Sequence, residues 1–321
     1  MRLATAAGLG AAAWTAGHVR APTVRRWHGS SAPVVTAGPL RTRVVADAGP
    51  ARSAGAPTLV LLHGIVGCGA YFGAPFDVLA RGRRLVVPDL LGFGDSYLAA
   101  APSGYGLEPH LDALDAMAAA LRLDGPLVVA GHSMGAVLAL HWAARRSDLV
   151  ARVVALSAPL YDSTTEALAH IRGLGRLEAL MALDGPVARA TCAWMCHHRT
   201  TAGWVAAAIK PQLPIPLARR GALHTWPAYL GSMDGLILNN PWRAAVKVLA
   251  DREIPTVLAA GGRDPVPVAG RAAELAAPCP TVTVRTHPTA GHDLPLADPD
   301  WCRDLLAESS ATSPPGAVRR S

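Results

Sequence analysis

The chain is poor in charged residues, in aromatic residues and above all in lysine. Charged residues make up 17% and aromatic residues 5% of its 321 residues, and Lys210 and Lys247 are the only lysines. The net charge of +7 is therefore due almost entirely to arginine, and the arginines form short, scattered clusters without aromatic residues among them. Binding of nucleic acid needs a basic patch or stripe, so we expect no nucleic-acid partner.

Cysteine is also scarce, which bears on the compartment. Five cysteines without regular spacing do not fit the paired framework of a small secreted domain, so we expect a reducing, cytoplasmic environment. Cys192 and Cys196 would share one face of a helix and precede His197 and His198, but no second group of ligands completes a tetrahedral metal site. We expect buried thiols there, no metal and no cofactor, because nucleotide and flavin motifs are absent as well.

A long apolar run is missing too. Residues 3–17 carry no charge and resemble a weak signal peptide or a short anchor, but they are too short to span a bilayer and no clean cleavage site follows them. We favour an N-terminal extension over residues 1–37, with export or membrane association through residues 3–17 as the alternative. The Ser- and Pro-rich residues 309–321 predict a disordered tail.

What the chain does contain, over residues 38–159 and 241–308, is an alternation of short apolar strands and Ala- and Leu-rich helical stretches. Such alternation predicts the α/β class, with a mostly parallel central sheet and helices on both faces. The hydrophobic fraction of 51% is enough for a large core. The predicted strands are 41–47, 57–62, 84–88, 126–130, 150–157, 255–260 and 281–286. The predicted helices of this part are 76–81, 108–123, 136–146, 241–249, 268–276 and 299–308.

Between residues 160 and 240 the alternation stops, and we expect a helical cap inserted into the core. Its helical stretches are 164–182, 186–198, 202–209 and 222–238, and we expect Pro211, Pro214 and Pro216 to break the helical pattern between the last two. Apolar side chains of this insertion are candidates to line a substrate pocket. The candidates are Trp194, Trp204, Trp226, Tyr229 and Met233.

The most specific local pattern is Gly-His-Ser-Met-Gly at residues 131–135. A predicted strand precedes it and a predicted helix follows it, so Ser133 would lie on a sharp turn with its hydroxyl projecting above the edge of the sheet. The flanking glycines leave room for the crossing backbone. A serine hydroxyl becomes a nucleophile when a base lies within hydrogen-bond reach and a carboxylate orients that base.

Candidates for both partners follow later strands. Asp264 comes after the sixth predicted strand and His292 after the seventh. Sites in parallel sheets lie at the carboxyl ends of the strands, so the order Ser133, Asp264, His292 predicts a Ser–Asp–His triad.

Neighbouring titratable residues have other expected roles. Asp162, which follows the fifth predicted strand, is an alternative for the acid. We expect His132 to point away from the cleft, His63 to form structural hydrogen bonds in the loop after its strand, and Asp293 to cap a loop.

Together these motifs resemble the α/β-hydrolase superfamily in its capped, esterase- or lipase-like form. The resemblance covers roughly residues 38–308. It implies that Ser133 is the nucleophile, His292 the base and Asp264 the acid that orients it, and that the backbone N–H groups of Ile65 and Met134 form an oxyanion hole. Its motifs, in order, are 63–67 (HGIVG), 89–96 (DLLGFGDS), 131–135 (GHSMG), and the pair 262–264 (GRD) and 291–292 (GH).

The function implied by the resemblance is a serine hydrolase that cleaves a carboxylic ester or a related, apolar, small-molecule acyl substrate through an acyl-enzyme on Ser133. A carbon–carbon bond hydrolase, an acyltransferase or a perhydrolase of the same fold would use the same three residues. A non-catalytic, ligand-binding protein of this fold is the alternative of a different class.

Overall fold

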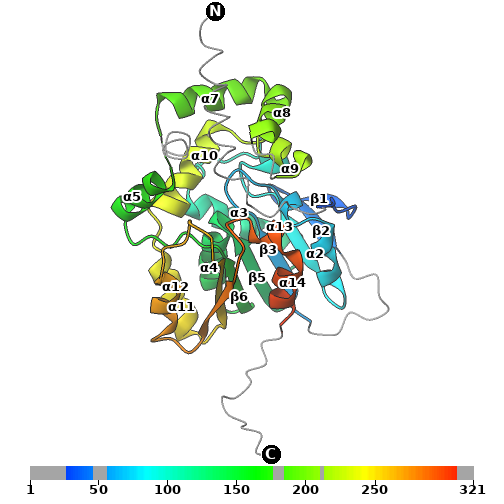
Figure 1. Ribbon diagram of the computed structural model, residues 1–321. Coiled ribbons are helices and arrows are strands. Elements are labelled where there is room, and N and C mark those ends of the chain that lie inside the picture. Colours follow the sequence, from blue (N-terminus) through cyan, green and yellow to red (C-terminus); the bar gives the residue numbers. More distant parts are fainter. Residues whose placement is uncertain (1–26, 46–55, 176–183, 210–212, 309–321) are drawn as a thin grey trace, which may run out of the picture.

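The structure, a computed structural model, describes residues 27–45, 56–175, 184–209 and 213–308. A sheet forms its centre, helices cover both faces of the sheet, and a further group of helices lies above one end (Figure 1). The α/β fold class predicted from the sequence is confirmed. The predictions for residues 1–26, which include the anchor-like residues 3–17, and for the tail 309–321 lie outside the described residues.

The strands of the central sheet are β1 (Val34–Ala37), β2 (Leu40–Val45), β3 (Thr58–Leu62), β4 (Leu85–Pro88), β5 (Leu127–His132), β6 (Val150–Leu156), β7 (Thr256–Gly261) and β8 (Val282–His287). They are hydrogen-bonded in the order β1-β2-β4-β3-β5-β6-β7-β8. β1 and β2 pair antiparallel, as do β2 and β4, and the remaining neighbours are parallel. Parallel neighbours need crossover connections, and these contain most of the helices.

The helices of the core are α2 (Ala74–Asp77), α3 (Leu107–Ala120), α4 (Met134–Arg145), α11 (Trp242–Asp251), α12 (Arg271–Ala276), α13 (Leu294–Ala297) and α14 (Pro299–Ala307), with the 3₁₀ turns η1 (Gly69–Tyr71), η2 (Val78–Ala80) and η3 (Gly94–Ser96). Successive side chains of a strand point to opposite faces of the sheet. In β3, Val60 and Leu62 therefore join a buried cluster with α3, α4 and α11, whereas Leu59 and Leu61 join a second cluster with α2 and α14. The two apolar layers fix the sheet between them.

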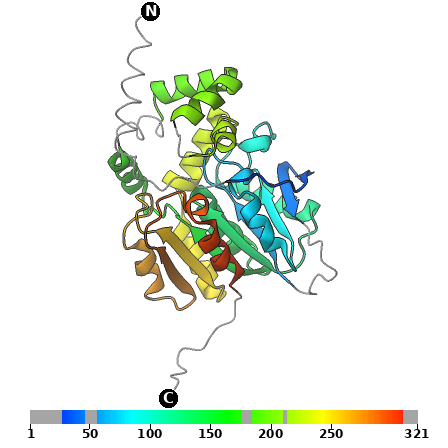
Figure 2. The same ribbon diagram turned by 45° about the vertical axis from the view of Figure 1, so that its right-hand side comes forward.

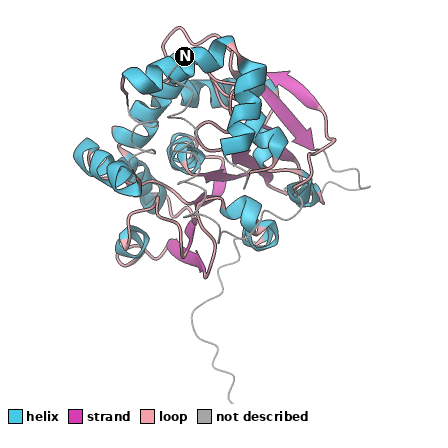
Figure 3. Ribbon diagram, turned by 45° about the horizontal axis from the view of Figure 1, so that its top comes forward, coloured by secondary structure: helices cyan, strands magenta, loops and turns pink. Residues whose placement is uncertain are grey.

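In the described part of the chain between β6 and α11 every named element is a helix, and Figure 2 shows these helices above the sheet, while Figure 3 turns that end of the molecule toward the viewer. These helices are α5 (Thr164–Leu174), α7 (Pro186–His197), α8 (Arg199–Ile209), α9 (Ile215–Arg220), α10 (Trp226–Met233) and the π-helix η4 (Asp234–Leu238). We call residues 160–240 the cap. A backbone bridge from Phe93 to His224 and an ion pair of 3.0 Å between Asp95 and Arg220 tie the cap to the core. Both contacts lie at the loop that follows β4.

Helix α9 differs from the sequence-based expectation, which placed a break at its prolines. Pro214 is the N-cap residue of α9, and Pro216 lies in the first turn. Proline is tolerated there because its missing N–H would have no intrahelical acceptor in any case. These two prolines therefore start a helix rather than interrupt one, and Pro211 lies outside the described residues.

Two further elements depart from the predicted boundaries. The sheet already begins at Val34, four residues before the predicted start of the core at residue 38, because β1 and β2 form an antiparallel hairpin. The short helix α13 directly follows the loop of His292, with Pro295 in its first turn. Asp293 is the N-cap residue of α13, although its side chain makes no capping hydrogen bond.

His110 joins the core to the cap and makes the stability dependent on pH. The ring lies on α3, is fully buried, and its Nε2–H donates to the Ser232 hydroxyl of α10 at 2.9 Å. Burial lowers the pKa of His110 to about 3. As the pH falls below about 6.5, the unfolded chain binds a proton that the folded chain excludes, so stability is lost between about pH 6.5 and pH 3.

Replacing His110 with glutamine, whose amide also donates to Ser232, should therefore remove part of this pH dependence. At pH 5 the histidine is expected to lower the free energy of unfolding by about 2 kcal/mol relative to pH 7. Urea unfolding of both proteins at the two pH values measures the difference. An equal loss of stability in wild type and variant would show that His110 does not titrate in this way.

Candidate active site

Ser133 lies on a sharp turn between β5 and α4, at the carboxyl end of the strand. Its backbone angles are φ 56° and ψ −122°, a strained conformation for a residue other than glycine. The turn brings two backbone segments into close approach. A Cβ on Gly131 would lie 2.0 Å from the carbonyl oxygen of Gly135, and one on Gly135 would lie 2.3 Å from that of Leu62. Both glycines are therefore needed for this turn, and the turn projects the serine from the sheet.

Three side chains from separate loops meet at this turn. The Ser133 hydroxyl lies 3.1 Å from Nε2 of His292, and Nδ1 of His292 lies 3.0 and 3.1 Å from the two carboxylate oxygens of Asp264. Because a carboxylate only accepts, Nδ1 carries the proton, and Nε2 accepts from the serine. Ser133 and the side chain of Asp264 are buried, while the His292 side chain is 28% exposed. The structure thus brings together the three residues that the sequence pointed to.

Asp264 is held in its charged form. Burial by itself raises the pKa of this carboxyl, but the hydrogen bond and charge of His292 and the Val266 N–H at 2.9 Å outweigh it, so that the pKa lies below its usual value. An ionised Asp264 keeps the proton of His292 on Nδ1 and would stabilise a positive charge on the ring.

The loop after β3 lies over Ser133. A Cβ on Gly64 would lie 3.2 Å from the Cβ of Ser133, so the backbone just before Ile65 is close to the serine. Within the described part of the chain, the N–H groups of Ile65 and Met134 donate to no protein acceptor. The Met134 N–H also belongs to the first turn of α4, where backbone donors are unpaired. Both donors belong to backbone segments next to Ser133.

His63 holds this loop in place. Its Nδ1–H donates to the Gly64 carbonyl at 2.8 Å, and its Nε2 accepts from the Leu90 N–H at 2.9 Å. Burial lowers the pKa of His63, so the ring is neutral and fills both hydrogen-bonding roles. The structural role expected for His63 agrees with these contacts.

The other carboxylates near the sheet edge have partners of their own. Asp89 accepts from the backbone N–H of Gly69 at 2.5 Å and of Asp95 at 2.6 Å. Asp162 forms ion pairs with Arg243 and Arg271 at the surface. Asp264 is thus the carboxylate that contacts His292, and the alternative placed on Asp162 has no such contact.

His132 packs against the loop that carries His292. Its ring lies between those of Tyr71 and His292, with centroids 5.0 and 4.8 Å away, and its Nε2–H donates to the His292 carbonyl at 2.7 Å. The Tyr71 hydroxyl donates to Asp293 at 3.1 Å. Both contacts anchor the loop that carries His292. These contacts are not visible in the sequence pattern, because Tyr71 and the loop of His292 lie far from His132 along the chain.

The five pocket candidates fall into two groups. Tyr229 and Met233 are buried, and Trp226 is partly buried; all three pack in one apolar cluster with Met134 and Ile65. Trp194 and Trp204 are 42% and 52% exposed and lie outside that cluster. The three candidates that pack against the core therefore all belong to α10. The expectation for Trp194 and Trp204 needs correction, because the small buried residues of α7 and α8, and not these tryptophans, face the protein.

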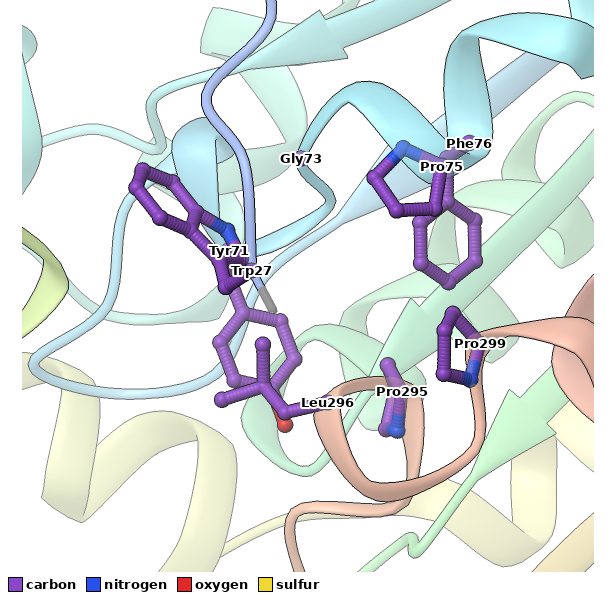
Figure 4. Close-up of a pocket in the computed structure, with 8 residues that line it drawn as sticks. All are labelled: Trp27, Tyr71, Gly73, Pro75, Phe76, Pro295, Leu296 and Pro299. Atoms are coloured by element: carbon purple, nitrogen blue, oxygen red, sulfur yellow. The ribbon is translucent and has the colours of Figure 1, made fainter. Parts of the chain in front are cut away.

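Two hollows in the described surface lie apart from the three residues. One has a volume of about 20 Å³, room for about one water, and lies beside α13 (Figure 4). Its lining is apolar and comprises Trp27, Tyr71, Gly73, Pro75, Phe76, Pro295, Leu296 and Pro299. The other, of about 380 Å³, lies where the cap joins the core, at Tyr161–Thr164 and Leu238–Pro241. Neither is lined by Ser133, Asp264 or His292.

The cysteines of α7 lie close together but do not form a metal site. Cys192 Sγ lies 4.0 Å from Cys196 Sγ and 3.8 Å from Nε2 of His224. Within the described ranges, no group of three or more His, Cys, Asp and Glu side chains is placed to hold a metal ion. Nor does any helix of that part of the chain combine the length and the apolar composition needed to cross a bilayer.

The fold and the matched family agree. A family model for the alpha/beta hydrolase fold matches residues 57–192, which include Ile65, Ser133 and Met134. Among solved structures, E-2-(acetamidomethylene)succinate hydrolase superposes with a TM-score of 0.61 over 85% of this chain and 96% of that chain, at 22% identity. The chain therefore has the α/β-hydrolase fold, and residues 57–192 resemble the family of that name.

Curated relatives with hydrolase names also match. The pimeloyl-[acyl-carrier protein] methyl ester esterase of Chromobacterium violaceum is 29% identical over 242 residues, which cover 74% of this chain and 87% of that protein. The probable lysophospholipase BODYGUARD 4 of Arabidopsis thaliana is 30% identical over 158 residues, 46% of this chain. The matched stretch spans 37% of that lysophospholipase and less than half of several other relatives.

Proposed function

We propose that the protein is a serine hydrolase that cleaves a carboxylic ester through an acyl-enzyme on Ser133. The observation that carries this proposal is the unbroken chain of hydrogen bonds from Asp264 through His292 to Ser133, with 3.0 Å at the first contact and 3.1 Å at the second. The strained turn at Ser133 supports it, because strain of this kind persists where the surrounding structure holds a functional side chain in place.

The proposed reaction uses the residues as follows. Ser133 attacks the carbonyl carbon of the substrate, and His292 takes the proton from the serine at Nε2. The charge that develops on the carbonyl oxygen is stabilised by the N–H groups of Ile65 and Met134; loss of one such donor typically costs about 3 kcal/mol. His292 then protonates the leaving group and activates a water that releases the acid. Asp264 stabilises the positively charged ring in both steps.

An ester with an apolar acyl part fits the surroundings of Ser133. Tyr229 and Met233 of α10 belong to the same buried apolar cluster as Met134, the residue that follows Ser133. The similarity of this chain to a methyl ester esterase, over most of the length of that protein, supports the proposal that the cleaved bond is an ester. Any such substrate is recognised mainly by burial of its apolar surface.

Hydrolysis of p-nitrophenyl esters from acetate to palmitate by the purified protein tests this proposal. We expect turnover of at least part of the series, with a single optimum of acyl length set by this apolar cluster. Replacing Met233 with alanine should shift the optimum to longer chains, because it removes bulk from that cluster. An absence of turnover on every ester of the series, with the protein folded, would contradict the proposed bond specificity.

A further inference from the structure

The ring of His132 is close to both loops that flank Ser133. His132 is the last residue of β5, and its side chain is buried. The centroid of its ring lies 4.8 Å from that of His292. A Cβ on Gly64 would lie 3.4 Å from Nδ1 of His132, so the ring also lies near the backbone of the loop after β3. One side chain therefore packs near the loop of the base and the loop of the proposed oxyanion hole.

The contact of His132 with His292 is a hydrogen bond to the backbone. Nε2–H of His132 donates to the carbonyl oxygen of His292 at 2.7 Å. The ring of His292 must reach Asp264 at one nitrogen and Ser133 at the other, and it does so at 3.0 and 3.1 Å. A shift of the His292 backbone would lengthen one or both of these contacts. The bond from His132 therefore bears directly on the geometry of the base.

His132 supplies this hydrogen bond without carrying a charge. Burial and the neighbouring His292 ring lower the pKa of His132 to about 4, so the ring is neutral near pH 7. In the proposed reaction His292 becomes positively charged when it takes the proton of Ser133. A second positive charge so close to His292 would oppose that step, and a neutral donor does not. The buried, neutral imidazole is therefore compatible with the charge that develops beside it.

Tyr71 connects His132 with the same loop. The two rings are stacked, with centroids 5.0 Å apart and 21° between their planes. The Tyr71 hydroxyl donates to Asp293 at 3.1 Å, and burial beside Asp293 raises the pKa of Tyr71 well above its usual value, which keeps the hydroxyl protonated. Tyr71 and Leu296 of α13 line the same small hollow (Figure 4). The loop is thus anchored at two successive residues, His292 by His132 and Asp293 by Tyr71.

We propose that His132 is a positioning residue for the base, because its hydrogen bond to the His292 carbonyl sets the distances from the His292 ring to Ser133 and Asp264. The inference rests on the proposed function, in which His292 takes a proton from Ser133. His132 acts through His292 and takes up no proton itself in the reaction. A displacement of about 1 Å in an active site can lower the rate by about 10²-fold, and here it would leave substrate binding unchanged.

Two substitutions of equal side-chain length separate the hydrogen bond from the volume of His132. His132→Gln keeps an N–H donor at the position of Nε2, and His132→Met has no donor. The matched control is His141→Met. His141 is also a buried histidine, but its Nε2–H donates to the side chain of Asn240 at 2.6 Å and not to the loop of His292. Each methionine variant thus loses one hydrogen bond of a buried histidine.

Steady-state kinetics on a short-chain ester measure the effect. We expect His132→Met to lower kcat by about 10- to 100-fold with KM unchanged. His132→Gln should retain most of kcat, and His141→Met should retain all of it. Equal kcat for His132→Met and wild type, a loss that His132→Gln does not restore, or the same loss in His141→Met would overturn the positioning role.

Amide hydrogen exchange of the peptide that spans residues 288–293 tests the anchor without a substrate. Exchange should be faster in His132→Met than in wild type, because the loop opens more readily, and it should be unchanged in His132→Gln. Tyr71→Phe is a milder variant that keeps the stacked ring and removes the bond to Asp293. It should also speed up exchange, and it should lower kcat less than His132→Met does. Unchanged exchange in both His132→Met and Tyr71→Phe would overturn the proposal.

The positioning role and the proposed function can fail separately. Folded wild type that hydrolyses no ester would contradict the proposed function, and the exchange measurement would still show whether His132 holds the loop. Active wild type together with an equally active His132→Met would contradict the positioning role alone, and the assignment of Ser133 as the nucleophile would stand.

Discussion

Replacing Ser133 with alanine is expected to lower kcat/KM for an ester by about 10⁴- to 10⁶-fold. The three residues act as a unit, and the substitution removes the oxygen atom that attacks the substrate. The fold should persist. Alanine keeps the single Cβ of serine, so the strained backbone at φ 56° gains no new contact, and the two glycines that shape the turn are unchanged. Steady-state kinetics, together with thermal unfolding of both proteins, measure the effect.

The matched control for this variant is Ser147→Ala. Ser147 lies in the turn after the C-terminal end of α4, whereas Ser133 precedes its N-terminal end. We expect the control to retain the wild-type kcat/KM. A Ser133→Ala protein that keeps more than a tenth of the wild-type activity would show that the hydroxyl is not the nucleophile.

Replacing Asp264 with asparagine is expected to lower kcat on the order of 10⁴-fold with little change in KM. Asparagine has nearly the same shape, but its amide can donate to Nδ1 of His292 and so favour the tautomer with the proton on Nε2. That nitrogen could then no longer accept from Ser133, and the 3.1 Å contact would lose its function. A lower kcat with an unchanged KM, both measured by steady-state kinetics, distinguishes this effect from damage to substrate binding.

Asp162 provides the control for the assignment of Asp264 as the acid, because its carboxylate also follows the end of a strand. Its side chain pairs with Arg243 and Arg271 and not with His292. Asp162→Asn should therefore change stability and leave kcat near the wild-type value. A large loss of kcat in Asp162→Asn, with Asp264→Asn nearly fully active, would reverse the assignment of the acid.

The class of fold and the meeting of the three residues were predictable for physical reasons. Parallel strands end at one edge of their sheet, so residues just after β5, β7 and β8 must lie near one another, whatever the details of the helices. Ser133, Asp264 and His292 all follow such strand ends. The glycines at 131 and 135 mark the turn because backbone atoms, and not side chains, occupy the space beside them.

The cap was harder to predict from the sequence. Helix α8 is rich in alanine, so its sequence does not show which side is buried, and the side facing α9 is selected by the space available at Gly203. Trp204 therefore turned out to lie on the outside. His132 shows a similar limit: its contacts depend on Tyr71 and on the loop of His292, which are far away in the sequence.

The most direct test of the account is covalent labelling with a fluorophosphonate, followed by mass spectrometry of the intact protein and of its peptides. Such a reagent is attacked by a serine oxygen that a neighbouring base has activated. The account predicts a single adduct on the peptide that contains Ser133, slower labelling of Asp264→Asn and none of Ser133→Ala. No adduct on the folded wild type, or an adduct that persists in Ser133→Ala, would contradict the claim that Ser133 is an activated nucleophile.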